Sequence, residues 1–437
     1  MNDDRLEELH GEVPGARTHE LGVRLRACES RGVTYLSDDF PVFWESASGA
    51  NVFDVDGNAF IDLSGAFGVA STGHANPYVA SAIADQALRL MHAMGDVHPT
   101  EVRVQLMEKL AQLAPGDLSK SYLAVTGSDA IETALKTAIL ATGKPAVAAF
   151  KGGYHGLSLG ALEVCGFEQF REPFADALRS RTLFLDFPRP EPVAGEGTAA
   201  AVATIRDAIA ARNDIGAILI EPIQARGGCV VPPKGFLSAL RALCDEFGLL
   251  LILDEIYTGF GRTGAMFAAV DEGVVPDILC VGKAMAGGFP ISAAIAKPAV
   301  MDAWEASRGE SLHTSTYLGN PMGCAAALAN IGEIERLELV NRARHLGHAL
   351  GARFDSLARV PPVVECRGRG LMWGIELRDA VLADATVKAA LRHGVILIPC
   401  GTQGNVLSIT PPLTIAERQL YRALDIVEDV LCKHGGT

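Results

Sequence analysis

The sequence predicts an α/β fold built on a parallel sheet, and two observations carry this prediction. Short apolar runs alternate with segments of helical pattern across the middle of the chain, as in strand–helix–strand units. Some runs are apolar at every position, such as Leu249–Leu253, which is typical of strands covered on both faces. The expected strands are 121–126, 145–150, 182–186, 215–220, 249–254 and 277–281, with 291–296 as a further one.

Helical patterns separate several of these strands and also precede the first. The expected helices are Pro77–Leu90, Thr100–Leu113, 129–142, 199–212 and 235–247. The strands that end at Asp254 and Val281 have no full helical pattern between them, so we expect an irregular connection there.

The two ends of the chain predict smaller units. Residues 1–40 are polar and mixed, which is typical of a helical arm followed by a loop. From Val42 onward the pattern is one of short strands, and Asp56-Gly57 is a good hairpin signal. After Pro321 we expect a long helix at about 322–356, with a break whose position the pattern does not fix. Strands are expected to follow at 363–367, 371–377, 395–398 and 406–409. Since no repeat or flexible linker separates these parts, both ends are expected to pack on the central part.

Composition excludes several classes of function. Of the 437 residues, 49% are hydrophobic, which favours a large core over disorder. The formal net charge of −14 argues against a nucleic-acid or anionic-membrane surface. No apolar run approaches the roughly 18 residues that span a membrane, and the acidic N-terminus lacks a signal-peptide pattern. The nine cysteines show no CxxC spacing, which indicates reduced thiols, no metal site and a cytoplasmic location.

Two polar residues at predicted strand ends are the candidate catalytic residues. Asp254 ends one buried strand and Lys283 follows the next, and open α/β sheets bind ligands at the carboxyl ends of their strands. Small neighbours such as Ala284 and Gly287 leave room for a planar group beside the lysine. An amine and a carboxylate presented together fit pyridoxal 5′-phosphate, because the amine forms a Schiff base and the carboxylate keeps the pyridine nitrogen protonated.

A phosphate site is expected where strand 121–126 meets the following helix. The run Thr126-Gly127-Ser128-Asp129-Ala130 puts backbone N–H groups and a serine hydroxyl at a helix start, which is a natural anion site. Gly127 and Ser128 are the candidate phosphate contacts. An ordinary helix cap has the same pattern.

Separate segments of the chain resemble the class III (ornithine/4-aminobutyrate-type) aminotransferases of fold type I. The resemblance rests on LILDEIYTGFGRTG, VGKAMAGGFP, TGSDA, GGYHGLSLG, IEPIQARGG, HTSTYLGNP and the N-terminal FDVDGNAFIDL. It covers the chain from about residue 40 and implies a large domain with a mostly parallel seven-stranded sheet, plus a small α+β domain from both chain ends. The implied segments are 1–75 in the small domain, 76–330 as the large cofactor-binding domain, and 331–437 as the rest of the small domain.

The resemblance also implies further cofactor contacts. Tyr154 would stack on the pyridine ring, with His155 beside it in the same loop. Ile256 would lie against the ring face, and Glu221 would be an acid near the cofactor. Tyr257 stands where family members commonly have glutamine, close to the cofactor's 3-hydroxyl.

A shared active site and a reaction follow from the same resemblance. Thr316 matches a threonine that reaches the phosphate bound by the neighbouring subunit, which implies a homodimer. The implied reaction is amino transfer from an amine or amino acid to a 2-oxo acid or aldehyde, with Lys283 moving the proton.

Three positions depart from the family pattern at the substrate end. Leu157 and Ser408 stand where ornithine-type and acetylornithine-type members have arginines that hold substrate carboxylates. Arg226 replaces the family's gating glutamate. Because serine and leucine cannot make the bidentate contacts of arginine, we expect 2-oxoglutarate and ornithine not to bind in the usual way. Two alternatives follow: Arg226 binds one substrate carboxylate, or the substrate carries no carboxylate.

Other functions remain open at this stage. Some class III relatives are racemases or epimerases, and GNVLSITPPLTI resembles the C-terminal strand of the aminocaprolactam racemases. A non-catalytic protein that binds the cofactor is a second alternative, which intact Lys283 and Asp254 disfavour. A nicotinamide or flavin enzyme is the third. GFGRTG (259–264) matches GxGxxG but lacks the following helix and later acid of a dinucleotide site.

Overall fold

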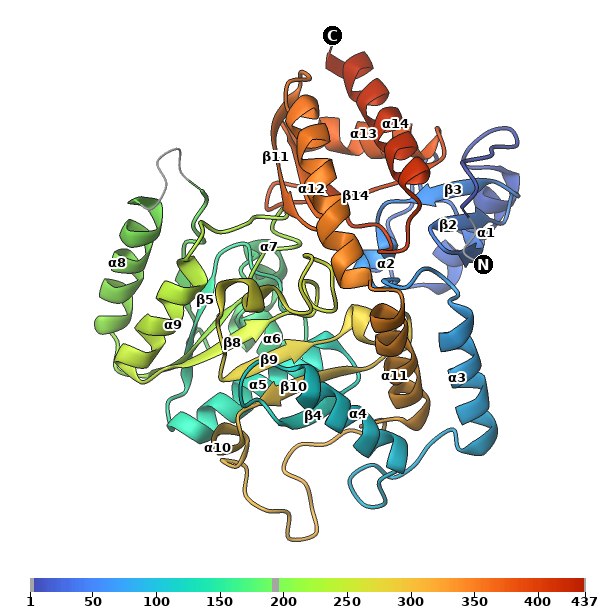
Figure 1. Cartoon of the computed structure of the whole chain (residues 1–437). Helices are drawn as coiled ribbons and strands as arrows, with labels where there is room; N and C mark the ends of the chain where they lie inside the picture. Colours follow the sequence, from blue (N-terminus) through green and yellow to red (C-terminus); the bar gives the residue numbers. More distant parts are fainter. Residues whose placement is uncertain (1–3, 191–195, 436–437) are drawn as a thin grey trace.

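The computed structural model describes residues 4–190 and 196–435, and its centre is a seven-stranded sheet (Figure 1). The strand order is β4-β10-β9-β8-β7-β5-β6. The strands are β4 (Lys120–Ala124), β5 (Ala146–Phe150), β6 (Leu183–Leu185), β7 (Ile215–Ile220), β8 (Leu250–Asp254), β9 (Ile278–Val281) and β10 (Ser292–Ala296). All the strands predicted for the middle of the chain are therefore confirmed.

The directions of these strands gather polar residues at one edge. β10 pairs antiparallel with both β4 and β9, while the other neighbouring pairs are parallel. The sheet is thus mostly parallel, as predicted. The carboxyl ends of β4, β5, β7, β8 and β9 meet at the same edge, which is where open α/β sheets bind ligands.

Both faces of the sheet are covered, which explains its fully apolar strands. Along β8, Leu251 and Leu253 belong to one hydrophobic core and Ile252 to the other. Burying such a side chain stabilises the fold by roughly 1.5–3 kcal/mol. One face is covered by α5 (Gly127–Thr142) and α6 (Leu159–Glu163), and the other by α4 (Glu101–Leu113), α9 (Phe236–Phe247) and α11 (Pro321–Arg336).

The remaining helices lie before, between and after these elements. They are α1 (Ala16–Cys28), α2 (Gly65–Gly68), α3 (Pro77–Arg89), α7 (Glu168–Arg171), α8 (Glu196–Ala210), α10 (Pro298–Met301), α12 (Leu339–Leu357), α13 (Ala380–Leu391) and α14 (Glu417–Gly435). Three short 3₁₀ helices are η1 (Glu172–Ala177), η2 (Ala268–Glu272) and η3 (Lys283–Met285). Between β8 and β9 the described chain forms turns and η2, so the predicted irregular connection is confirmed.

Two small sheets are built from the chain ends. The first has the order β1-β2-β3-β13 and the second β11-β12-β15-β14. Their strands are β1 (Trp44–Ser48), β2 (Asn51–Asp54), β3 (Ala59–Asp62), β11 (Val363–Arg369), β12 (Met372–Leu377), β13 (Val395–Ile396), β14 (Ile398–Cys400) and β15 (Val406–Ile409).

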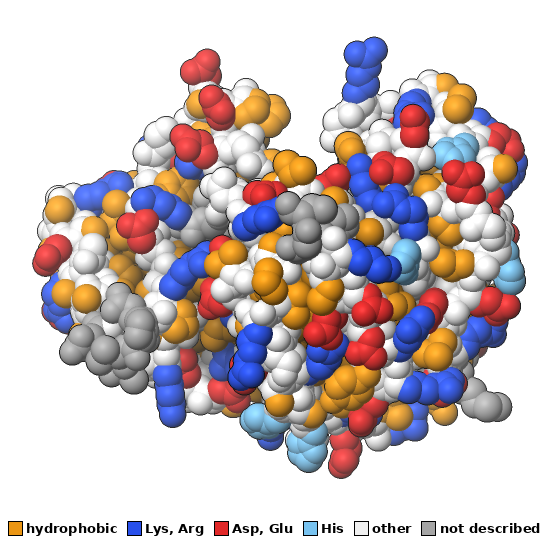
Figure 2. Space-filling view, turned by 90° about the horizontal axis from the view of Figure 1, so that it is seen from above, with side chains coloured by type: hydrophobic (Ala, Val, Ile, Leu, Met, Phe, Trp, Pro, Cys, Tyr) orange, Lys and Arg blue, Asp and Glu red, His pale blue; other side chains and the backbone are white. Residues whose placement is uncertain are grey.

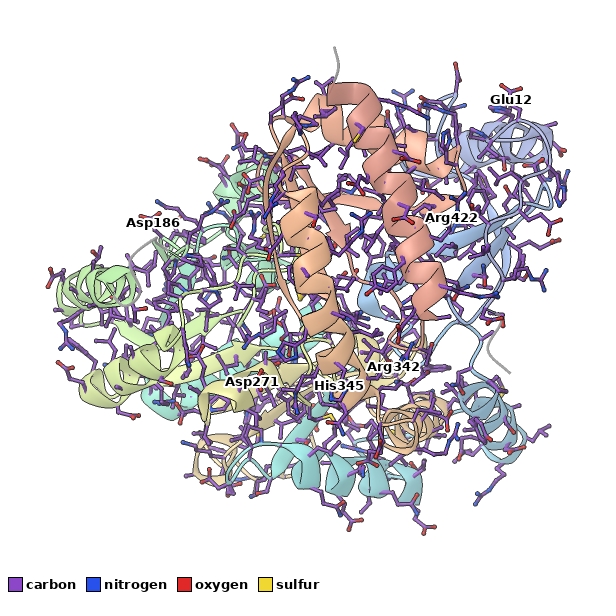
Figure 3. The ribbon with its side chains drawn as sticks, turned by 45° about the horizontal axis from the view of Figure 1, so that its top comes forward. Glu12, Asp186, Asp271, Arg342, His345 and Arg422 are labelled. Carbon is purple, nitrogen blue, oxygen red and sulfur yellow. The ribbon has the colours of Figure 1, made fainter. Side chains whose placement is uncertain are left out.

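The N-terminal and C-terminal segments form this small domain together. β13 pairs parallel with β3, so one sheet contains strands from both ends of the chain. Arg422, labelled on α14 in Figure 3, forms an ion pair with Glu7 at 2.6 Å. At the start of α12, Arg342 donates to the carbonyl oxygens of Leu413 (3.0 Å) and Ile415 (2.5 Å). The predicted small domain from both ends is confirmed, and the boundaries at residues 75 and 330 stay predictions.

Two predicted elements are divided in the structure. The helical stretch expected at 322–356 is broken, as predicted: α11 ends at Arg336 and α12 begins at Leu339. Between them Glu338 has a φ of 51°, a left-handed conformation that interrupts a helix. The strand expected at 395–398 is likewise two strands, one in each small sheet.

The GFGRTG segment forms turns that join the two domains. The described chain has no helix directly after it, so the dinucleotide interpretation fails there. Arg262 is fully buried and donates to the carbonyl oxygens of Leu371 (3.0 Å) and Pro411 (2.5 Å). This arginine therefore holds the C-terminal part of the chain against the large domain.

The surface and the thiols are consistent with the composition. Figure 2 shows acidic and basic side chains interspersed over the face seen from above. The nine cysteines, which all lie within the described residues, are free thiols. Among the helices of the described chain, none is both long and apolar enough to cross a bilayer.

Candidate functional site

The carboxyl ends of the central strands enclose a cavity of about 420 Å³, which we call the inner cavity. It lies where α5 begins and where β5, β7, β8 and β9 end. Every candidate cofactor contact from the sequence except Thr316 lines it: Gly127, Ser128, Tyr154, His155, Glu221, Asp254, Ile256, Tyr257 and Lys283. The sheet thus brings together residues that are up to 156 positions apart in the chain.

Asp254 is fixed by two hydrogen bonds at the end of β8. Its Oδ2 lies 2.7 Å from His155 Nδ1, and its Oδ1 accepts the backbone N–H of Ile256 at 3.0 Å. Asp254 is 4% exposed and His155 is 2% exposed, so the pair is almost fully shielded from water. His155 Nε2 is buried without a hydrogen-bond partner in the described protein. The sequence placed His155 in the site but did not predict this pairing.

Lys283 follows β9 in an unusual backbone conformation. Its φ is 39°, in the left-handed region that non-glycine residues rarely adopt. Its Nζ lies 4.3 Å from the centroid of the Tyr257 ring. Burial lowers the pKa of Lys283, while the nearby carboxylates of Asp254 and Glu221 oppose that shift. A lowered pKa increases the fraction of unprotonated amine, which is the nucleophilic form.

Glu221 is a buried acid directly after β7. Its two oxygens accept the backbone N–H groups of Tyr154 at 2.8 Å and Ala225 at 3.0 Å. Burial raises the pKa of Glu221 to about 7, with a further upward effect from Asp254 and a downward effect from His155. This carboxyl group can therefore hold or release a proton near neutral pH.

The N-terminus of α5 forms another part of the wall of the inner cavity. Thr126 and Asp129 form a capping box, which satisfies two backbone N–H groups. The N–H groups of Gly127 and Ser128 belong to the first turn, whose donors have no intrahelical acceptor. The Ser128 hydroxyl lies 2.6 Å from that of Ser158, which in turn donates to Glu132 at 2.8 Å. A set of oriented donors at a helix start is suited to a phosphate.

Glycines keep this end of the cavity open. A Cβ at Gly127 would lie 2.9 Å from Cδ1 of Ile256, and one at Gly156 would lie 2.5 Å from Oγ of Ser128. Both distances are shorter than carbon and oxygen atoms tolerate. Gly156 also has a φ of 111°, which favours glycine.

A second cavity of about 400 Å³, the outer cavity, opens on the other side of Lys283. It shares Tyr154, Glu221, Tyr257 and Lys283 with the inner cavity. Its remaining walls are Phe67, Val69, Ala225, Arg226, Ile398, Pro399, Cys400 and Ser408. The two cavities together form one site with the lysine amine at their junction.

Among the described residues, the lining of the outer cavity contains two cationic side chains, Lys283 and Arg226. The guanidinium of Arg226 lies 4.9 Å from the centroid of the Tyr154 ring and 5.2 Å from that of Phe170. The Tyr257 hydroxyl lies 3.0 Å from Thr410 Oγ1, which holds its ring across the cavity.

Some walls of the outer cavity give no signal in the sequence. Phe67 lines the outer cavity, whereas Trp44, Met94 and Val97 are exposed and line neither cavity of this chain. The Ile398–Cys400 wall was missed because its strand belongs to the small domain. Ala66 and Phe67 have φ values of 49° and 61°, a conformation that residue propensities do not predict.

Thr316 is not brought to either cavity of this chain. It lies in an exposed turn between α10 and α11. A contact from this residue to the site therefore needs a second subunit.

These features fit the pyridoxal 5′-phosphate that the sequence implies. A helix N-terminus faces one end of the inner cavity, and a buried carboxylate and an amine lie on its walls. The unpartnered His155 Nε2 leaves polar capacity for a bound group or water. The space cleared by Gly127 and Gly156 would disappear with any larger residue.

The comparison with known proteins gives a consistent result. The family model described as aminotransferase class-III matches residues 34–431. The 5-aminovalerate aminotransferase of Pseudomonas putida is 37% identical over 433 residues, which cover 95% of this chain and 98% of that protein. The putrescine aminotransferase of Pectobacterium atrosepticum is 37% identical, with 93% of this chain and 86% of that protein covered.

A solved structure has the same fold over nearly the whole chain. It is an amine transaminase from an uncultivated Pseudomonas species in a pyridoxal-phosphate-bound form. The TM-score is 0.86 at 29% identity, and the match covers 93% of this chain and 98% of that one.

Proposed function

This chain belongs to the class III aminotransferases, which depend on pyridoxal 5′-phosphate, and we propose that it transfers the terminal amino group of a primary amine. One observation carries the assignment of the site: an amine and a carboxylate from neighbouring strands share a cavity with a helix N-terminus. The relatives named above are aminotransferases, so the racemase alternative is not favoured. Their named substrates, 5-aminovalerate and putrescine, both present a primary amine at the end of an unbranched chain.

The roles of the inner-cavity residues follow from their contacts. When bound, the cofactor withdraws electrons from the carbon that carries the amino group. Asp254 would keep the pyridine nitrogen protonated, and Gly127 and Ser128 would hold the phosphate. Tyr154 and Ile256 would enclose the ring, with Tyr257 and His155 at its edge.

Lys283 would have two functions. Its amine would hold the cofactor as a Schiff base between reactions. Once freed by the substrate amine, Nζ would take the proton from the substrate carbon, a step favoured by the lowered pKa of this lysine. Glu221, whose pKa is about 7, would hold a proton beside the reacting atoms.

Arg226 would select the carboxylate of a substrate in the outer cavity. Leu157 and Ser408 supply no positive charge to the cavity walls. Arg226 is therefore the side chain that can form charge-assisted hydrogen bonds with a 2-oxo acid while its guanidinium remains stacked on Tyr154.

We also propose that the protein forms a homodimer, because an apolar patch is exposed on its surface. The patch consists of Met91 (61% exposed), Met94 (55%), Val97 (62%), Leu312 (75%) and Tyr317 (60%). Its two segments are joined by bonds from Asn320 Nδ2 to the Met91 carbonyl at 3.1 Å and from Thr314 Oγ1 to Asp96 at 2.9 Å. Apolar patches of this kind are typical of protein–protein contacts.

Thr316 lies inside this patch, which supports a phosphate contact across the interface. A mixture of two inactive or weakened variants tests it. In a hybrid dimer of Lys283→Ala and Thr316→Ala chains, one site has both wild-type residues. Recovery of activity above the sum of the separate variants supports shared sites, and a purely additive mixture contradicts them.

We also propose a cytoplasmic location. The free thiols of all nine cysteines are typical of proteins kept in reducing compartments.

The assignment of Lys283 and of the amine class has a direct test. Reduction of the cofactor-loaded protein with borohydride should add the cofactor mass to the peptide that contains Lys283, and Lys283→Ala should show no such adduct. A panel of ω-amino acids, diamines and α-amino acids should then bleach the bound cofactor's visible band fastest with the terminal amines. Faster bleaching by α-amino acids would contradict the proposed donor class, and an adduct on another lysine would contradict the site.

A further inference from the structure

A buried asparagine lies beneath the turn that carries Lys283. Asn330 is on α11 and is 0% exposed. Its Nδ2 donates to the carbonyl oxygen of Ala284, the residue directly after Lys283, at 2.6 Å. The same nitrogen donates to Ser71 Oγ at 3.3 Å, and its Oδ1 accepts the hydroxyl of Thr72 at 2.6 Å.

The chemistry of these partners requires an amide. A backbone carbonyl only accepts hydrogen bonds, so the Ala284 oxygen needs the NH₂ side of the asparagine. The oxygen side must then face Thr72, whose hydroxyl donates. Both N–H donors and one acceptor position are used, so neither a carboxylate nor an apolar side chain can satisfy the same partners.

The backbone at Lys283 has a conformation that its surroundings must stabilise. Lys283 has a φ of 39°, and Gly287, a few residues later, has a φ of 63°. Such conformations persist in non-glycine residues only when the surroundings impose them. A Cβ at Gly287 would lie 2.5 Å from Asn330 Oδ1, so the turn is packed directly on this amide.

The same amide connects the lysine to the wall of the outer cavity. Ser71 and Thr72 follow α2, the short helix that contains Phe67. Ser71 Oγ also lies 3.4 Å from the Ala284 carbonyl oxygen. One buried group therefore contacts the lysine turn and the segment that leads from Phe67.

We propose that Asn330 is a positioning residue, which holds the Lys283 turn in its left-handed conformation and so aims the lysine amine at the junction of the two cavities. This inference rests on the proposed role of Lys283. Asn330 itself touches neither cavity, so its effect is transmitted through the Ala284 carbonyl.

The decisive variant is Asn330→Asp, which keeps the size of the side chain. It retains an acceptor for Thr72 but sets an oxygen against the Ala284 carbonyl. We expect kcat to fall about 10- to 100-fold, the scale of a small misplacement of a reacting group, with KM little changed. Thr72→Val should move kcat in the same direction by a smaller factor, and it keeps the test available if Asn330→Asp folds poorly.

A labelling experiment separates positioning from general damage. In cofactor-free protein, the rate at which an amine-reactive reagent modifies Lys283 is followed against pH by mass spectrometry of its peptide. In Asn330→Asp the midpoint should move upward toward the ordinary lysine value, because a released side chain gains access to water.

The matched control is Asn76→Asp, a second buried asparagine of the same region. Asn76 caps α3 and donates to the Thr72 carbonyl at 3.3 Å, one step further from Lys283. The Asn76→Asp variant should lower the thermal midpoint without moving the midpoint of Lys283 labelling.

An unchanged labelling midpoint and kcat in Asn330→Asp and Thr72→Val would overturn the inference. A Lys283→Ala variant with full activity would instead overturn the proposed function.

Discussion

The inner and outer cavities meet at Lys283, but they are built in different ways. The inner cavity is formed by the ends of sheet strands and by the start of α5, so the central sheet fixes its geometry. The outer cavity is closed by Phe67, Arg226 and Ile398–Cys400, which come from a short N-terminal helix, a loop and the small domain. In the proposed roles, the groups for the common chemistry thus lie at the ends of sheet strands, and the group that selects a substrate lies on a loop.

The side chains of the two cavities are also held by different kinds of contact. Asp254 and Glu221 each accept two hydrogen bonds, and both are buried. Arg226 is exposed and is held by stacking on two aromatic rings. Substitutions in the inner cavity should therefore affect every substrate, while those in the outer cavity should affect some substrates and not others.

The largest effect is expected from Asp254→Asn. Asparagine keeps the shape and an acceptor for the Ile256 N–H, but it removes the negative charge beside the cofactor. We expect kcat to fall about 10²- to 10⁴-fold for every amine, the range for loss of an acid–base group. Asp62→Asn is the matched control, because Asp62 on β3 forms a similar but partly buried pair with His74 at 2.8 Å. Equal losses of kcat in the two variants would contradict the distinction between the regions.

The pH dependence of stability should reveal the raised pKa of Glu221. Its pKa is about 7 in the fold, against an ordinary value of 4.5, so the folded protein keeps a proton that the unfolded chain has released. Between these two values stability therefore falls as pH rises, by up to about 3 kcal/mol for this group.

Glu221→Gln should remove that contribution. The thermal midpoint of the cofactor-free variant, relative to wild type, should increase from pH 4.5 to 7 and then level off. A constant difference over this range would show that Glu221 titrates at an ordinary pKa.

A smaller and more selective effect is expected from Arg226→Gln. Loss of a charge-assisted hydrogen bond should raise KM for a 2-oxo acid about 10- to 100-fold. KM for a neutral amine donor should remain near the wild-type value, because the amine end lies at Lys283. Arg171→Gln serves as control, since Arg171 also stacks on an aromatic ring (4.1 Å from the centroid of Phe184) but lines neither cavity. An equal rise for both substrates would remove Arg226 from carboxylate recognition.

The same contrast explains what the sequence could predict. The central strands were identifiable because runs such as Leu249–Leu253 are apolar on both faces, and the inner-cavity residues follow such runs directly. Ile398–Cys400 could not be placed, because the strand expected at 395–398 divides between two sheets. Asn330 gives no local signal either, since its partners Ala284 and Thr72 are 46 and 258 positions away.

The smallest effect, from Ser158→Ala, tests how far the rigid character of the inner cavity extends. Ser158 lines the inner cavity, and its hydroxyl lies between Ser128 Oγ at 2.6 Å and Glu132 at 2.8 Å, so it orients the Ser128 hydroxyl at the helix start. One neutral hydrogen bond contributes about 1 kcal/mol, so the cofactor should bind about fivefold more weakly while kcat at saturating cofactor stays constant. Ser238→Ala, which removes a bond to the Glu272 carbonyl far from the site, should change neither quantity. If Ser158→Ala lowers kcat as well, the phosphate end also positions the reacting atoms, and the inner cavity acts as one rigid unit from α5 to Lys283.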